Sequence, residues 1–116
     1  MLNKSYSEIR TEMLESAKAA STKYFIEQLG GQDAYACGFA WVEVYPKYKG
    51  NTRQGRAEIE ALKALGLEKS WNKSYQIWNP GGLNCQNVDA KEAGARAAAA
   101  VLKKYGFSAY PASRLD

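Results

Sequence analysis

Histidine is absent from this chain of 116 residues, and cysteine occurs only at Cys37 and Cys85. Without histidine, Ser-His and Cys-His nucleophilic catalysis are excluded, and so is a zinc site with four Cys or His ligands. The two cysteines form no CxxC pair, so we expect reduced thiols. The sequence also lacks a paired-carboxylate motif. We therefore expect neither an enzyme nor a bound cofactor or metal ion.

Long apolar segments are missing as well. The chain has no run of about 20 apolar residues, the length that crosses a bilayer, and no charged n-region followed by an apolar h-region at its start. Its length supports one modest hydrophobic core but not two. We expect a single soluble, intracellular domain over residues 1–116, with no membrane contact.

The first segment predicts a helix within residues 1–31. Ser5 and Glu8 have the spacing of a capping box, apolar residues follow at three- and four-residue intervals as far as Tyr24, and Gly30-Gly31 ends the pattern. Such a stripe is typical of a packing face. The sequence leaves open whether it packs on its own sheet or on a second copy of the chain.

Residues 34–116 predict a mixed α/β core that begins with a strand. The segment AYACGFAWVEVY, residues 34–45, is rich in aromatic and β-branched residues, and both of its alternating sets are largely apolar. We therefore expect a central strand covered on both faces. Glu43 is the exception, and it is interpreted either as an exposed or ion-paired residue or as a carboxylate that contacts a ligand.

Two further helices and two further strands follow in alternation. We expect a helix over residues 52–65, a strand over 74–78, a helix capped by Asp89 and Glu92 with Lys103 and Lys104 at its end, and a short last strand within 107–115. Small residues from Gly94 along this last helix predict close approach to a neighbouring element. The fold class is α+β, in the order α-β-α-β-α-β, with a sheet of about three strands packed by helices.

The net charge of +4 is concentrated in one stretch. Between Tyr45 and Ala57 the chain has four basic residues and no acidic one, whereas the remaining basic and acidic residues balance. A general nucleic-acid binder would spread its cations over a face or a helix. A compact basic segment suits a small anion or a short nucleic-acid segment, although it is also compatible with a solvent-exposed turn.

The basic segment includes a near match to a phosphate-binding loop. Gly50 to Ala57 reads G-x-x-x-x-G-R-A, but Ala57 lacks the hydroxyl that would hold Mg²⁺, so an NTPase is rejected. Arg53 and Arg56 nevertheless open a helix where acidic residues are favoured. An anion at the helix start would explain them, and exposed arginines without a ligand are the alternative.

A second group of residues combines aromatic and amide side chains in the segment WNKSYQIWNPGGLNCQNVD. Aromatic rings stack on bases, and amides match base edges, although the same residues also suit a strand core and a turn. Arg114 near the C-terminus is a further anion contact. The candidate ligand-binding residues are Lys47, Lys49, Asn51, Thr52, Arg53, Arg56, Trp78, Asn79, Gln86, Asn87 and Arg114.

Several segments carry a resemblance to a known group: GFAWVEVYPKYKGNTRQGRAE, WNP, CQNVDAKEAGARAAA and SRLD. Over roughly residues 34 to 116 the chain resembles small tailed-bacteriophage proteins of unassigned function. The resemblance implies a phage origin and action in the host bacterial cytoplasm. It implies no catalytic residues.

The combined hypothesis is a non-enzymatic phage accessory protein that binds a small phosphate-containing ligand. In this hypothesis it counters host defence by sequestering a nucleotide immune signal, such as a cyclic nucleotide, as a homo-oligomer. One alternative is a single-stranded nucleic-acid-binding protein. Another is a protein-protein inhibitor of a host defence factor.

Overall fold

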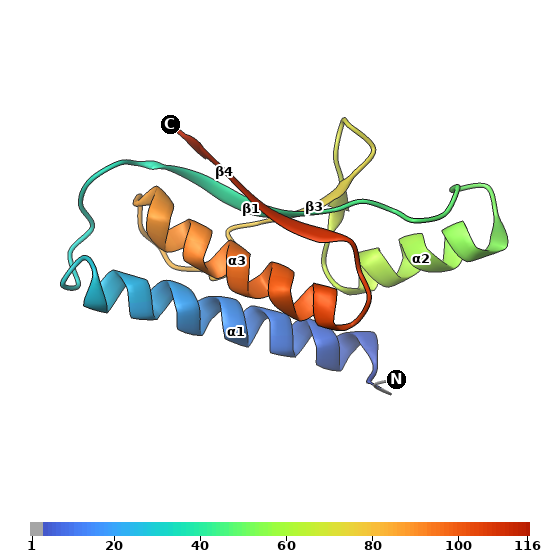
Figure 1. Ribbon diagram of the computed structural model, residues 1–116, viewed down its shortest axis with the longest axis horizontal. Coiled ribbons are helices and arrows are strands. Elements are labelled where there is room, and N and C mark those ends of the chain that lie inside the picture. The colour runs from blue at the N-terminus through green and yellow to red at the C-terminus, as the bar shows by residue number, and fades with distance from the viewer. Residues whose placement is uncertain (1–3) are drawn as a thin grey trace.

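Two antiparallel helices and a sheet form three layers in the computed structural model, which describes residues 4–116 (Figure 1). α3 lies between the sheet and α1. The sheet is antiparallel, with strand order β2-β3-β1-β4. The elements are α1 (Tyr6–Glu27), β1 (Gly38–Val44), α2 (Arg53–Ala64), β2 (Glu68–Lys69), β3 (Tyr75–Trp78), α3 (Val88–Lys104) and β4 (Ala109–Leu115).

The α+β class is confirmed, and the sheet has one strand more than expected. β2 is only two residues long and pairs with β3 through a tight hairpin. In that hairpin the Ser70 N–H donates to the Ser74 carbonyl over 2.8 Å. Because β2 consists of Glu68 and Lys69 alone, it has no alternating apolar pattern by which a strand could be predicted.

Small residues bring α1 and α3 close together. A Cβ atom added at Gly94 would lie 2.3 Å from the Ser21 hydroxyl oxygen, so only glycine fits there. Ser21 is fully buried on α1, and its hydroxyl donates to the Ala90 carbonyl of α3 over 2.8 Å. The predicted close approach is therefore confirmed, and its partner is α1 of the same chain.

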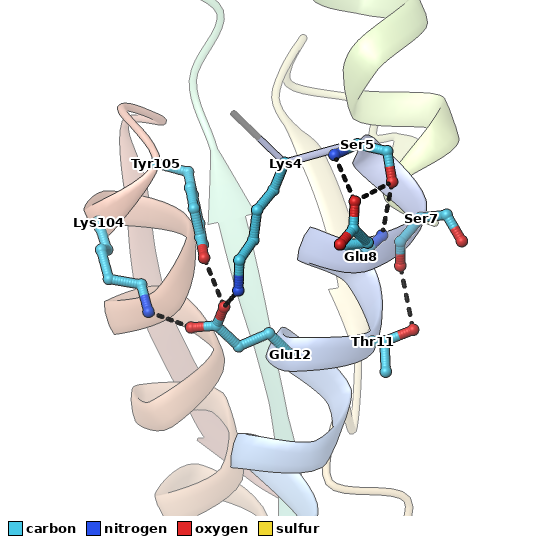
Figure 2. A network of polar contacts seen from close by, with 8 residues as sticks. All are labelled: Lys4, Ser5, Ser7, Glu8, Thr11, Glu12, Lys104 and Tyr105. Atoms are coloured by element: carbon cyan, nitrogen blue, oxygen red, sulfur yellow. Dashed lines mark hydrogen bonds and ion pairs between the residues drawn. The ribbon is translucent and has the colours of Figure 1, made fainter. Parts of the chain in front are cut away.

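The N-terminal part of α1 is fixed by polar contacts (Figure 2). The predicted capping box is present, with the Glu8 N–H bound to the Ser5 hydroxyl and the Ser5 N–H bound to the Glu8 carboxylate. One turn further, the Glu12 carboxylate accepts hydrogen bonds from Lys104 and Tyr105 at the end of α3. These bonds lower the pKa of Glu12 to about 2. The charged carboxylate thus ties α1 to the C-terminal end of α3.

The N-terminus of α3 differs from the prediction by two residues. Asn87, not Asp89, is the N-cap, because its side-chain oxygen accepts the Ala90 N–H over 2.9 Å. Its side-chain nitrogen donates to the Ala34 carbonyl over 2.7 Å. Asp89 lies in the first turn, where its charge still favours the helix. Both residue types are good caps, and the burial of Asn87 selects it.

The expectation that β1 is covered on both faces is wrong. Val42 and Val44 are fully buried on the side of the helices, whereas Phe39 and Tyr45 remain 38% and 44% exposed on the other side. Helices α1 and α3 both lie on one side of the sheet, and the β2-β3 hairpin rises on the opposite side (Figure 1). Within residues 4–116, no helix covers this second face.

β4 forms an edge of the sheet and includes a proline. The Tyr45 N–H donates to the Ser108 carbonyl, and the Asp116 N–H donates to the Cys37 carbonyl, each over 3.0 Å. Hydrogen-bonded pairs alternate along an antiparallel ladder, so the nitrogen of Pro111 points away from β1. A proline there costs the sheet no hydrogen bond and interrupts the edge at which another strand would pair.

Candidate functional site: the open face of the sheet

The uncovered side of the sheet has an unusual composition. We call this surface the open face; it is formed by Phe39, Trp41, Glu43, Tyr45, Glu68, Gln76, Trp78, Tyr110, Ala112 and Arg114. Alternation along each strand sends the aliphatic residues, such as Val42, Val44 and Ile77, to the side of the helices. The open face therefore has aromatic and polar side chains but no aliphatic one larger than alanine.

Three aromatic rings form the centre of the open face. Trp41 and Trp78 are cross-strand partners whose rings stack with centroids 4.4 Å apart and planes at 24°. Phe39 meets the edge of Trp78 with a centroid distance of 6.2 Å and an angle of 74°. Trp78 is still 47% exposed. A planar ligand could therefore stack on the surface that Trp78 leaves open.

A chain of hydrogen bonds holds the polar residues of the open face in place. The Tyr45 hydroxyl donates to one oxygen of Glu43 over 2.6 Å, and the Gln76 amide donates to the other over 2.7 Å. The indole N–H of Trp78 donates to the oxygen of Gln76 over 3.1 Å. These contacts orient the Trp78 ring before any ligand arrives.

Glu43 keeps its charge on this surface. Partial burial alone would raise the pKa of Glu43, but the hydrogen bonds from Tyr45 and Gln76 outweigh that effect and leave the pKa below its usual value. A fixed negative charge therefore lies near the middle of the open face. It repels phosphate groups from the centre and leaves the rim for them.

Cations lie at both ends of β4, on the rim of the open face. The Arg114 guanidinium is 5.4 Å from the centroid of the Phe39 ring, and the Lys103 ammonium is 5.0 Å from that of Tyr110. Both distances are in the range of cation–π attraction. Neither Arg114 nor Lys103 forms an ion pair within residues 4–116. Their charges can act on an approaching anion.

The predicted basic loop is held together by its own contacts. Thr52 is the N-cap of α2, with its hydroxyl oxygen accepting the Gly55 N–H over 3.0 Å. The Arg56 guanidinium donates to the Asn51 carbonyl over 3.1 Å. Lys47 donates through its side chain to the Gly106 carbonyl. Arg53 is exposed at the start of the helix.

Glu58 already occupies main-chain donors of the same loop. Its carboxylate accepts the Lys47 N–H over 2.9 Å and the Tyr48 N–H over 3.1 Å. These are donors that an anion would use in a phosphate-binding loop. Lys49 is exposed beside them. The loop thus offers side-chain cations to an anion, whereas the Glu58 carboxylate of α2 already accepts two of its main-chain N–H groups.

The predicted amide residues have mainly structural contacts. Asn87 uses both ends of its side chain inside the fold. Asn79 has a left-handed backbone with φ 44° and donates to the Leu83 carbonyl over 3.1 Å. Gln86 has an exposed side chain, and its N–H binds Asp33 over 2.8 Å.

Trp78 and Arg114 are the two predicted residues that share the open face. The basic loop and α2 lie at one end of the molecule, and the C-terminus that follows Arg114 lies at the other (Figure 1). The sequence prediction missed Phe39, Tyr45 and Tyr110 as surface residues. Each of the three longer strands has a polar residue on this face, which is a signal that the face is exposed. The sequence alone does not show that these residues share a face, because that depends on the strand register.

Comparison of the chain with protein-family models, with curated proteins and with solved structures finds no match. None of the helices in residues 4–116 combines the length and the apolar content needed to cross a bilayer. The geometry of the open face is therefore the main basis for a functional assignment.

Proposed function

We propose that the protein binds single-stranded nucleic acid on the open face and catalyses no reaction. The observation that supports this proposal is the set of half-exposed aromatic rings, centred on Trp78, on an uncovered antiparallel sheet. Stacking of bases on such rings contributes about 1–3 kcal/mol per base and tolerates any sequence. Gln76 and Glu43 between the rings add groups that hydrogen-bond to base edges.

The absence of aliphatic residues favours nucleic acid over a protein partner. Stable protein interfaces have cores that resemble protein interiors, where aliphatic and aromatic side chains mix. Apart from Ala112, the aliphatic residues of the strands point away from the open face, and the face is mainly aromatic, amide or charged. Flat π surfaces with polar groups between them fit bases better than they fit a protein core.

The charge distribution favours one orientation of the nucleic-acid strand on the open face. Glu43 in the middle disfavours a phosphate there, whereas Arg114 and Lys103 attract phosphates to the rim. Bases would then lie over the rings, and the sugar-phosphate backbone would follow the edge. Phe39 on β1 and Tyr45, the residue that follows β1, are six positions apart, a length of roughly 20 Å in an extended chain. This length exceeds one base, which favours a strand over a single nucleotide.

The proposed cellular role follows from the same base-stacking chemistry. The resemblance to tailed-bacteriophage proteins supports an accessory function in the host bacterial cytoplasm. A protein that stacks bases could act on single strands during phage replication, or it could sequester a cyclic nucleotide signal of a defence system. A protein-protein inhibitor is the remaining alternative. The ligands compared in the binding assay separate the single-strand role from the cyclic-nucleotide role.

The test is fluorescence anisotropy with labelled 12-nucleotide DNA and RNA single strands. Trp78→Ala is expected to weaken binding about 5- to 150-fold, the loss of one stacked base, and Trp78→Phe to restore part of it. Tyr35→Ala is the matched control, because Tyr35 is 80% exposed in the loop before β1 and lies outside the open face. The control variant is expected to bind like the wild type.

Several outcomes would overturn the proposal. Wild-type protein that binds neither single strand at low salt contradicts it, and so does a Trp78→Ala variant that binds as tightly as the wild type. Competition by an unlabelled cyclic dinucleotide at lower concentration than the 12-mer would assign the face to the small signal molecule instead. Native mass spectrometry of the same samples reports the subunit count and tests the expected homo-oligomer.

A further inference from the structure

A pocket of about 390 Å³ adjoins one end of the open face. Tyr45 belongs to both surfaces, since its hydroxyl binds Glu43 on the open face and Tyr45 is also a lining residue of the pocket. The pocket is lined by Tyr45, Pro46, Tyr48, Gly50, Ile59, Lys69, Asn72, Lys73 and Tyr75. It therefore lies between the β2-β3 hairpin and the basic loop that precedes α2.

The pocket lining has two cations and no acid. Lys69 and Lys73 come from the two sides of the hairpin, and neither forms an ion pair within residues 4–116. Lys73 has a left-handed backbone, with φ 69°, at the hairpin turn. The basic loop adds Gly50, which has no side chain, to the opposite wall. Two lysines on a concave, acid-free surface attract an anion.

The hydroxyl of a largely buried tyrosine on the pocket wall supports the same conclusion. Tyr75 is only 4% exposed and lines the pocket, yet its hydroxyl has no hydrogen-bond partner among the described residues. The fully buried unpaired side-chain atoms in residues 4–116 are Trp41 Nε1 and Asn79 Oδ1. The Tyr75 hydroxyl is not among them, so it is open to the pocket that Tyr75 lines. There it can donate to a phosphate oxygen.

We propose that this pocket binds a phosphate group of the nucleic-acid strand whose bases stack on the open face. The inference rests on the proposed function and extends it to residues outside the open face. Lys69 and Lys73 neutralise the phosphate, and the Tyr75 hydroxyl donates to one of its oxygens. Tyr45, at the junction, contacts the nucleotide between the last stacked base and the bound phosphate. The pocket thereby sets where the strand leaves the face.

Charge-neutral variants of the lysines test the pocket. Lys69→Gln with Lys73→Asn removes both charges, and asparagine tolerates the left-handed backbone at position 73. Each phosphate contact contributes about 0.7 to the slope of log K against log salt for single strands. Because both lysines contact the same phosphate, the double variant is expected to reduce this slope by roughly 0.7 and to weaken 12-mer binding about tenfold at low salt. Lys18→Gln with Lys23→Gln, on exposed positions of α1, is the charge-matched control.

Tyr75→Phe and a small probe complete the experiment. Phenylalanine keeps the buried ring, so the fold is retained while the hydroxyl is lost, and a severalfold weaker affinity for the 12-mer is expected. In an NMR titration of wild-type protein, inorganic pyrophosphate should shift the amide signals of Lys69, Lys73 and Tyr75. The same probe should leave the signals of Phe39 and Trp78 unchanged.

The outcomes separate the pocket from the open face. If the double-lysine variant keeps both the affinity and the salt slope of the wild type while Trp78→Ala loses binding, the pocket proposal is wrong and the proposed function stands. If the wild type binds no 12-mer but pyrophosphate shifts the pocket signals, the proposed function is wrong and the pocket is an independent anion site. If the control with Lys18→Gln and Lys23→Gln weakens 12-mer binding equally, the effect of the double-lysine variant reflects only the loss of net charge. The pocket proposal is then also wrong.

Discussion

Asn87→Ala should destabilise the protein more than an ordinary helix-cap substitution. The substitution removes the cap to the Ala90 N–H, worth about 1 kcal/mol, and the hydrogen bond to the Ala34 carbonyl, worth about 1 kcal/mol more. A fully buried side chain is also deleted, which leaves a cavity at the start of α3. We expect a loss of about 2–3 kcal/mol in the free energy of unfolding.

Urea denaturation followed by far-UV circular dichroism measures this loss. Thr52→Ala is the matched control, because Thr52 caps α2 through one hydroxyl at a half-buried position. That variant should lose about 1 kcal/mol. The Thr52 hydroxyl also makes a second hydrogen bond, to the Lys49 carbonyl over 2.6 Å. Equal losses in the two variants would therefore show that the burial of Asn87 contributes nothing.

The same variant separates a structural from a ligand-binding role for Asn87. A loss below about 0.5 kcal/mol, within the range of ordinary surface substitutions, together with weaker 12-mer binding, would refute the structural interpretation. Asn87 would then be a ligand residue, as the sequence suggested. We expect the opposite pattern, with unfolding affected and the affinity of the folded protein unchanged.

Two further predictions concern the contact between α1 and α3. Gly94→Ala should lower the free energy of unfolding by about 1–3 kcal/mol, because the added methyl group is overpacked against Ser21. In a double-mutant cycle measured by urea denaturation, Ser21→Ala in the same chain should recover part of this loss. Additive losses would contradict the contact. Glu12 has a folded-state pKa of about 2 against an ordinary 4.5, so its contribution to stability is present above pH 4.5 and is lost as the pH falls towards 2. Glu12→Gln should flatten the pH dependence of the melting temperature in this window, and an unchanged acid profile would refute the role of the ion pair.

Local signals in the sequence predicted most of the helices and the longer strands. The capping box at Ser5 and Glu8 involves residues only three positions apart, so no tertiary information is needed to find it. Small residues around Gly94 likewise indicated close packing, although not the partner. The choice between Asn87 and Asp89 as a cap could not be predicted, because it depends on the burial of Asn87 against a distant loop.

The open face could not be predicted because both alternating sets of β1 are apolar. Val42 and Trp41 look equally suited to a core, and only the placement of α1 and α3 on one side leaves Trp41 on the other. The polar residues Gln76 and Arg114 share this face through strand register, which the sequence does not specify. Lys69 and Lys73 were overlooked for a similar reason, since a pocket joins segments far apart in the chain.

Alternation along β1, β3 and β4 also has an evolutionary consequence. The side chains that build the core and those that form the open face occupy separate positions, so substitutions at Phe39, Gln76 or Tyr110 need not disturb the packing of Val42 or Ile77. Ligand preference can therefore diversify within a conserved scaffold. Relatives of this chain would be expected to keep the inward positions and to vary the outward ones with the ligand they recognise.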